Sequence, residues 1–123
     1  MRKAIYKKLE EIYPTYYIGN EKKTTPKPYL IFKMGNEIKT HTFGRWQTFT
    51  VFAIAPAGDF EILDTMSEKI IKGLDGKHIN RISDGSTFLI QFMDCGDEFV
   101  EGELNAISKQ LNFKIPSFGR DFM

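Results

Sequence analysis

Residues 45–55, RWQTFTVFAIA, have the composition of a half-buried β-strand, in which aromatic and β-branched side chains dominate. Phe49, Val51 and Ala53 fall on one side of such a strand. The other side carries Trp46, Thr48, Thr50, Phe52 and Ile54. Towards the N-terminus, residues 28–35 (PYLIFKMG) give an equally clear strand signal. We predict that the two strands form an antiparallel hairpin. Its polar connection, residues 36–44, is longer than a tight turn requires and is expected to project as a loop.

Helical periodicity flanks this hairpin on both sides. Residues 59–74 predict an amphipathic helix with Asp59 as its N-cap. Its apolar stripe consists of Phe60, Leu63, Met66, Ile70 and Leu74. Residues 2–12 predict a second helix, which ends at Tyr13 because the residue before a proline is driven out of the helical region. Tyr16 to Ile18 could form a brief additional strand.

The C-terminal half predicts three further strands. Residues 77–82 and 87–93 are expected to pair through the Gly-containing turn at 83–86. Residues 104–115 alternate apolar and polar side chains, and Pro116 is expected to stop that strand. The prediction is therefore an α+β fold of order α-β-β-α-β-β-β, an antiparallel sheet of about five strands with two helices on one face. Residues 1–116 would form a single domain and residues 117–123 a C-terminal arm.

The charge is balanced in total but uneven along the chain. Seventeen basic and 16 acidic residues give a net charge of +1, so no overall field indicates a nucleic-acid or membrane partner. Residues 1–27 carry seven basic and three acidic side chains, a net of +4. Residues 94–103 (DCGDEFVEGE) carry five acidic and no basic ones, a net of −5. We interpret the acidic segment as a loop or an acidic contact surface.

Cellular location is only weakly constrained by the sequence. No apolar run approaches the roughly 20 residues of a membrane-spanning helix, and residues 1–13 lack the apolar stretch of a signal peptide. The single cysteine, Cys95, excludes an internal disulfide. We expect a protein that is used in the cytoplasm or carried out of the cell inside something larger.

No residue pattern in the chain predicts catalysis, a metal centre or a cofactor site. The acids of residues 94–103 do not have the spacing of an EF-hand loop, and the glycines form no phosphate-binding pattern. His41, His78 and Cys95 have no catalytic spacing, and an enzyme would require them to converge on folding. Lysines and tyrosines of residues 1–27 could hold a single nucleic-acid strand, but no recognition motif accompanies them. We predict no enzyme, no cofactor and no sequence-specific nucleic-acid binding.

The predicted order resembles the tail-completion, or tail-terminator, family of long-tailed bacteriophages. Four segments carry the resemblance over roughly residues 4–116, as pattern rather than as motif identity: KPYLIFKMGNE (27–37), GRWQTFTVFAIAP (44–56), GDFEILDTMSEKIIKGLDGK (58–77) and AISKQLNFKI (106–115). The resemblance implies a structural ring subunit, usually hexameric, that caps the tail tube and joins it to the head. It also implies three partners, namely further copies of the chain, a tail tube protein and a head-closure protein. DNA would only pass through the lumen, no membrane would be involved, and the protein would reside in the tail of the virion.

The uneven charge suggests how copies could meet in such a ring. A ring contact joins two different patches, so a basic region and an acidic one favour closure. Residues 36–44 and the arm from Phe118 to Phe122 are candidate docking surfaces, with a plain hairpin loop and a frayed terminus as the alternative. The candidate interface residues are Lys3, Lys7, Lys22, Lys23, Asp97, Glu98, Glu101, Lys39, His41, Phe43, Phe118 and Phe122. The alternative function is a small ligand- or protein-binding α+β module of a bacterial accessory system.

Overall fold

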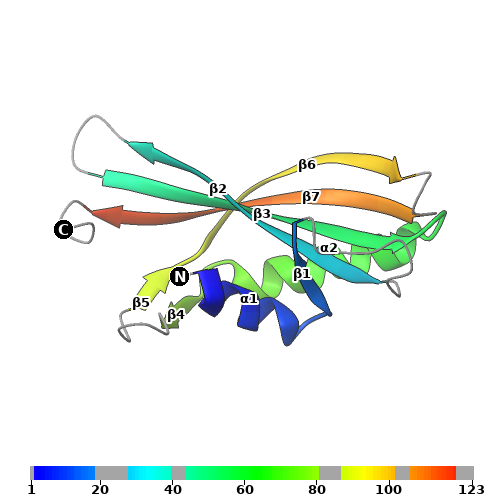
Figure 1. Ribbon diagram of the computed structural model, residues 1–123, viewed down its shortest axis with the longest axis horizontal. Helices are drawn as coiled ribbons and strands as arrows, with labels where there is room; N and C mark the ends of the chain where they lie inside the picture. Colours follow the sequence, from blue (N-terminus) through cyan, green and yellow to red (C-terminus); the bar gives the residue numbers. More distant parts are fainter. Residues whose placement is uncertain (1, 19–27, 40–43, 81–86, 102–105, 119–123) are drawn as a thin grey trace.

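Long β-strands determine the shape of the molecule, and both helices lie on the same side of them (Figure 1). The computed structural model describes residues 2–18, 28–39, 44–80, 87–101 and 106–118. The helices are α1 (Arg2–Glu10) and α2 (Phe60–Leu74). The strands in this part of the chain are β1 (Thr15–Tyr17), β2 (Tyr29–Lys39), β3 (Gly44–Pro56), β4 (His78–Asn80), β5 (Thr87–Leu89), β6 (Gln91–Glu101) and β7 (Ala106–Phe118).

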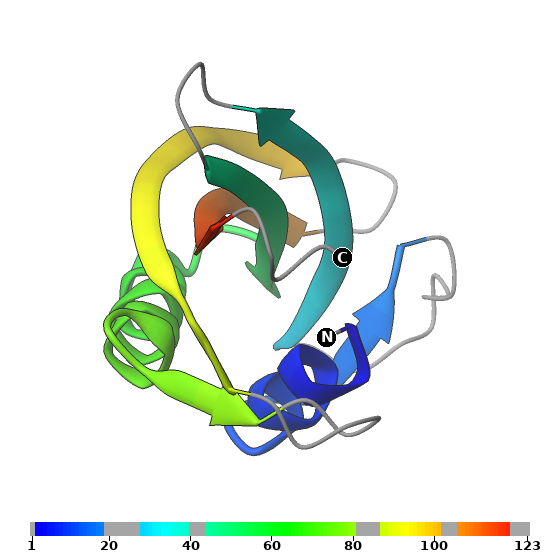
Figure 2. The same cartoon turned by 90° about the vertical axis from the view of Figure 1, so that its left-hand side faces the viewer.

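The main sheet has five strands in the order β1-β2-β3-β7-β6. Strand β3 lies at its centre and pairs with β7 along its whole length, from Gly44 opposite Phe118 to Pro56 opposite Ala106. All pairs are antiparallel except β1 with β2, which is parallel. Figure 2 shows that the sheet is strongly curved, with β2 and β6 arching on either side of β3 and β7. The predicted α+β class, with a mostly antiparallel sheet and two helices on one face, is confirmed.

The predicted hairpin is longer than expected. Residues 36–39 belong to β2 and residue 44 to β3, so the prediction of a projecting loop over 36–44 is wrong for most of its length. Lys39 pairs with Arg45, after a register shift between Met34 and Glu37. Polar composition does not prevent pairing here, because backbone hydrogen bonds hold the strands together where the hairpin extends past the helices (Figure 1). Residues 40–43 lie outside the described residues.

A small second sheet joins the helical layer to the main sheet. It contains only β4 and β5, paired from His78 opposite Leu89 to Asn80 opposite Thr87. The predicted strand 87–93 is divided at Ile90, which is fully buried. Ile90 still pairs with the chain after α2, since its N–H donates to the Lys77 carbonyl at 3.0 Å. From the next residue the chain runs in β6. The predicted turn at 83–86 lies outside the described residues.

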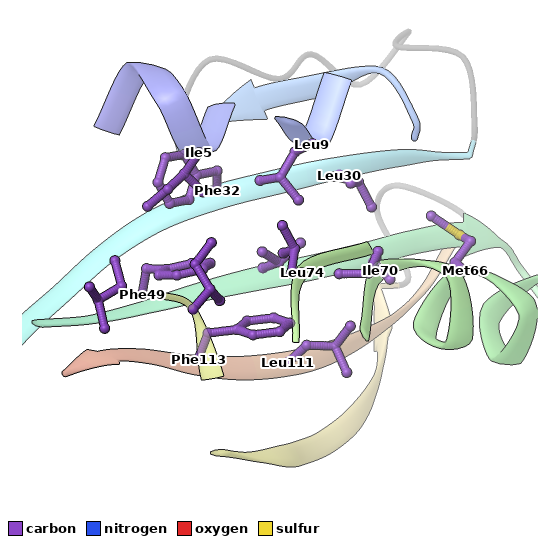
Figure 3. Close-up of a cluster of buried hydrophobic side chains, with 14 of the residues drawn as sticks. Ile5, Leu9, Leu30, Phe32, Phe49, Met66, Ile70, Leu74, Leu111 and Phe113 are labelled. Carbon is purple, nitrogen blue, oxygen red and sulfur yellow. The ribbon is translucent and has the colours of Figure 1, made fainter. Parts of the chain in front are cut away.

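One hydrophobic core fills the space between the helices and the sheet (Figure 3). Phe49, Val51 and Ala53 on β3 are fully buried, as their alternation predicted. The odd-numbered apolar residues of β7 are buried as well. The helices contribute a shared set of buried side chains: Ala4, Ile5, Leu9, Leu63, Met66, Ile70 and Leu74. A smaller cluster on the helix-free face consists of Tyr29, Ile31, Ile54 and Ala106.

The ends of the helices follow ordinary capping chemistry. The Asp59 side chain accepts a hydrogen bond from the Ile62 N–H at 3.2 Å, so the predicted N-cap of α2 is confirmed. At the other end, the Asp75 N–H donates to the Ile71 carbonyl, and Gly76 follows with φ +73°. Helix α1 ends at Glu10, two residues before the predicted end, although the Ile12 N–H still donates to the Leu9 carbonyl.

Pro116 does not stop the last strand. It pairs with Trp46, and β7 continues to Phe118, which the prediction had assigned to an arm. The pairing of β6 with β7 starts at Gln91 opposite Lys114, so β6 has no residue opposite Pro116. A proline is tolerated in a strand where one side needs no ladder hydrogen bond. Residues 119–123 lie outside the described residues.

Candidate assembly surface

Residues 94–101 of the acidic segment lie in β6, the outer edge strand of the main sheet, and residues 102–103 lie outside the described residues. The prediction of a loop is therefore wrong for Asp94, Asp97, Glu98 and Glu101, all of which lie in β6. Glu98 pairs with Lys109 of β7, and the register shifts between Phe92 and Asp94 and again between Cys95 and Glu98. Charges and bulges are both common on edge strands, because they disfavour unwanted strand pairing.

Large apolar side chains are exposed on the same strand. Met93 is 40% exposed, Phe99 45% and Val100 80%. Only two other large hydrophobic residues are comparably exposed in the described part of the chain, Ile18 and Phe60. These β6 residues are not among the predicted interface residues, because the prediction placed their segment in a loop. The sequence does contain one indication of an exposed apolar surface here, because Phe99 and Val100 interrupt the acidic segment.

Asp94 differs from the other acids of β6 because its carboxylate accepts a hydrogen bond from the neighbouring strand β7. Asn112 Nδ2 donates to Asp94 Oδ1 at 2.7 Å. The side-chain oxygen of Asn112, Oδ1, accepts from Thr50 Oγ1 at 2.9 Å and from Gln110 Nε2 at 3.0 Å. This polar network crosses β3, β7 and β6 on the helix-free face. It leaves Asp97 and Glu98 as the exposed acids whose side chains are better placed to meet a partner.

Helix α1 carries the opposite charge near the other edge of the sheet. Lys3 and Lys7 are exposed on it, and its first turn contains no acidic residue. Lys8 forms an ion pair with Glu11, with 3.4 Å between Nζ and Oε2. Both side chains reach solvent, with exposed fractions of 39% and 68%, and such a pair contributes little to stability. Figure 1 shows α1 close to β1, whereas β6 lies at the far edge of the sheet order. Lys22 and Lys23 lie outside the described residues.

The tyrosines beside these lysines are used for packing. The rings of Tyr6 and Tyr17 stack with centroids 4.6 Å apart, and Tyr16 meets Tyr29 edge-on at 5.6 Å. The Tyr6 hydroxyl donates to the Thr15 carbonyl at 2.7 Å. Burial raises the pKa of Tyr6, and the neighbouring Glu10 carboxylate raises it further. The half-buried rings of Tyr6, Tyr16 and Tyr17 therefore take part in packing contacts within the fold.

Two candidate docking segments meet at one end of the sheet. Lys39 ends β2 and Phe118 ends β7, and both flank the beginning of β3, where Gly44 pairs with Phe118 and Arg45 with Lys39. Nearby, Lys114 Nζ lies 3.9 Å from the centroid of the Trp46 ring, a cation–π contact. His41, Phe43 and Phe122 lie outside the described residues.

The described residues contain no constellation suited to catalysis or metal binding. No group of three or more His, Cys, Asp or Glu side chains in this part of the chain is placed to hold a metal ion. Cys95 is exposed on β6, whereas His78 lies in the small sheet. A surface hollow of about 510 Å³ lies beside α2, lined by Glu68, Ile71, Lys72 and Asp75. Among the described residues, no helix is long and apolar enough to span a membrane.

Comparison with known proteins gives a fold likeness. The chain is similar to a chain of a solved structure described as the virion of a native gene transfer agent (GTA) particle, with a TM-score of 0.70 and 15% sequence identity. The match covers 97% of this chain and 95% of the other. No protein-family model matches the chain, and no curated protein matches it. At this identity the likeness establishes the shared fold.

The structure thus separates the predicted interface residues into three places. Lys3 and Lys7 lie on α1, Asp97, Glu98 and Glu101 on the β6 edge, and Lys39 and Phe118 at the end of the sheet. Within one copy, the acidic and basic groups are far apart in the strand order and do not form a single site. They can be brought together only between two copies.

Proposed function

We propose that the chain is a structural protein of a phage-like virion and, more specifically, a tail-completion protein. In this role it forms a ring that caps the tail tube and joins it to the neck of the head. Its partners would be copies of itself, the tail tube protein and a head-closure protein. DNA would pass through the lumen of the ring without being recognised, and the protein would end up in the tail of the virion.

The observation that carries the proposal is the near-complete fold match to a chain of a gene transfer agent virion. The match covers 97% of this chain and 95% of the other, so the likeness concerns the fold as a whole and not one element of it. The described residues also offer exposed surface for contacts on the β6 edge and on α1, and no group of three or more His, Cys, Asp or Glu side chains among them is placed to hold a metal ion. Surfaces without a catalytic cleft favour an assembly role over chemistry.

A ring subunit needs two different patches that complement each other. Contacts between unlike patches produce closed rings when the rotation between neighbours closes, and open filaments when it does not. A chain with a basic helix at one edge of its sheet and an acidic strand at the other meets this requirement. A small binding module would instead need a deep apolar pocket, and the hollow described beside α2 is lined by half-buried Ile71 together with exposed Glu68, Lys72 and Asp75.

The proposal is tested by deleting the gene in the cell that encodes it and examining the particles by electron microscopy. A cap ends polymerisation of the tube, so its loss should give tubes of irregular length and heads without tails. Resupply of the intact chain from a plasmid should restore joined particles. Normal particles after deletion would contradict the proposal.

Purified protein provides an independent measurement. Mass photometry and negative-stain microscopy over a range of concentrations should detect closed rings. A strict monomer that also fails to bind isolated tails would favour the binding-module alternative.

A further inference from the structure

The two outer edges of the main sheet differ in how they are covered. At the β1 edge, the Thr15 carbonyl already accepts the Tyr6 hydroxyl at 2.7 Å, and α1 lies alongside. At the other edge, no strand of the described chain pairs with β6 on its outer side. On the β1 side, the three-residue strand β1 and α1 cover Leu30–Phe32 of β2, whereas β6 has no strand on its outer side in the described chain.

The β6 edge exposes both acidic and apolar side chains. The acids alone would be enough to discourage unwanted strand pairing. Asp97 and Glu98 are exposed on this edge. The same strand also exposes Phe99 and Val100. Phe99 pairs with Ser108 and Val100 with Ile107, so the two side chains point to opposite faces, and Phe99 shares the face of Asp97. An exposed apolar side chain beside an acidic one is typical of a contact with a partner of opposite charge.

Helix α1 offers the matching chemistry. Arg2, Lys3 and Lys7 are exposed on it, and the long apolar stems of lysine side chains can cover apolar surface while their ammonium groups reach carboxylates. Ile18, 55% exposed, lies just after β1 at the same edge. Charge complementarity between the two edges selects a second copy of this chain as the occupant.

We propose that the β6 edge of one copy packs against α1 of the next copy, with Phe99 under the lysine stems and Asp97 facing Lys7. The contact runs through side chains and not through an added strand, because two register shifts interrupt β6, and β1 and α1 cover Leu30–Phe32 of β2. This inference rests on the proposed ring and names the surfaces that close it.

The native cysteine makes a direct test possible, because Cys95 is exposed on β6 and no other cysteine is present. In a Lys7→Cys variant, oxidation should link Cys95 of one copy to residue 7 of the next and give a ladder of multimers on a non-reducing gel. The matched control is Lys72→Cys, an exposed lysine on α2. At micromolar protein, thiols held in contact have an effective concentration in the millimolar range, so the ladder should form on the order of a hundredfold faster than in the control. Equal rates in the two variants would overturn the inference.

A charge exchange gives a second and independent readout. Asp97→Lys alone and Lys7→Glu alone should each weaken self-association by roughly tenfold or more, since each places like charges together. The variant that carries both changes should recover ring formation. If wild-type rings form and neither single change weakens them, the inference fails while the proposed function stands. If deletion of the gene leaves particles normal, the proposed function itself fails.

Discussion

The rings of Phe49 and Phe113 stack at the centre of the sheet, with centroids 5.1 Å apart and planes inclined by 10°. The two residues are register partners on β3 and β7, and both are fully buried. The contact is the middle of an aromatic row that crosses all five strands. Tyr17 meets Phe32 at 5.9 Å, Phe32 meets Phe49 at 5.7 Å, and Phe113 meets Phe92 at 5.5 Å. The edge strand β6 is thereby joined to the core by a ring on the helix-covered face.

Removal of one ring from this row should destabilise the whole domain. Phe113→Ala is expected to lower the free energy of unfolding by about 3–5 kcal/mol, because it removes buried area and leaves a cavity between two aromatic neighbours. Phe113→Leu should lower the free energy of unfolding by clearly less, since leucine keeps most of the buried volume. Urea unfolding followed by circular dichroism measures both. Phe60→Ala, at a residue 50% exposed, is the control and should change stability by no more than about 0.5 kcal/mol.

A carboxylate hydrogen bond helps to join the end of α2 to the start of β6. Asp75 Oδ1 accepts the Phe92 N–H at 2.8 Å where the chain enters the main sheet. Asp75→Ala should cost about 1 kcal/mol of stability, because that N–H loses its acceptor. Asp75→Asn retains an oxygen acceptor and should recover most of the loss. Equal losses for the two variants in urea titrations would show that the hydrogen bond is not the cause.

The fold was predictable where a buried face imposes a period on the sequence. The alternation of Phe49, Val51 and Ala53 describes a face that the structure does bury. The predicted helical stripe from Phe60 to Leu74 is also buried, except at Phe60, which is 50% exposed. The N-cap at Asp59 followed from local chemistry alone. Each of these signals arises within one element, so no knowledge of its neighbours was needed.

The acidic strand was not predictable in the same way, because it has little buried face to impose a period. In β6, from Met93 to Val100, every side chain is exposed except Gly96, which is half-buried. The pairing of β6 comes from β7, whose own alternation was clear, and from the Phe92–Phe113 contact at its start. Strand order also depends on long-range pairing. For this reason the assignment of β4 and β5 to a separate sheet could not be derived from composition.

The charges along the sequence predict which segments carry the charged residues of the candidate assembly surface. They do not predict where those residues lie in the fold. Lys7 and Asp97 were selected because their segments have opposite net charge, and the structure places them near opposite edges of the sheet. Phe99 and Val100 were missed, because exposure of an apolar side chain depends on the edge position of its strand. The contact between two copies remains a prediction.

A close approach between two strands makes Gly35 sensitive to substitution. A Cβ atom built on Gly35 would lie 2.4 Å from Thr48 Oγ1 and 3.3 Å from the Thr48 carbonyl oxygen. Gly35→Ala should therefore destabilise the protein by about 1–3 kcal/mol through overpacking. In a double-mutant cycle, addition of Thr48→Ala should recover part of this loss, because it removes the hydroxyl but not the carbonyl. Strict additivity of the two losses in thermal unfolding would contradict a direct clash.

Tyr6 should give the protein a measurable loss of stability at alkaline pH. Its pKa is raised above the ordinary value of 10.0, chiefly by burial and then by Glu10, so folding favours the protonated hydroxyl that donates to Thr15. A group with a raised folded-state pKa contributes stability that is fully present below its unfolded pKa and is lost as pH rises through the folded one.

At neutral pH, Tyr6→Phe should lower the free energy of unfolding by about 0.5–1.5 kcal/mol, the value of one hydrogen bond. The difference between wild type and Tyr6→Phe should stay constant up to about pH 10 and shrink above it, while contributions of the other tyrosines cancel in the comparison. Urea unfolding at a series of pH values measures this difference, and a difference that stayed constant through the alkaline range would show that Tyr6 titrates alike in the folded and unfolded chains.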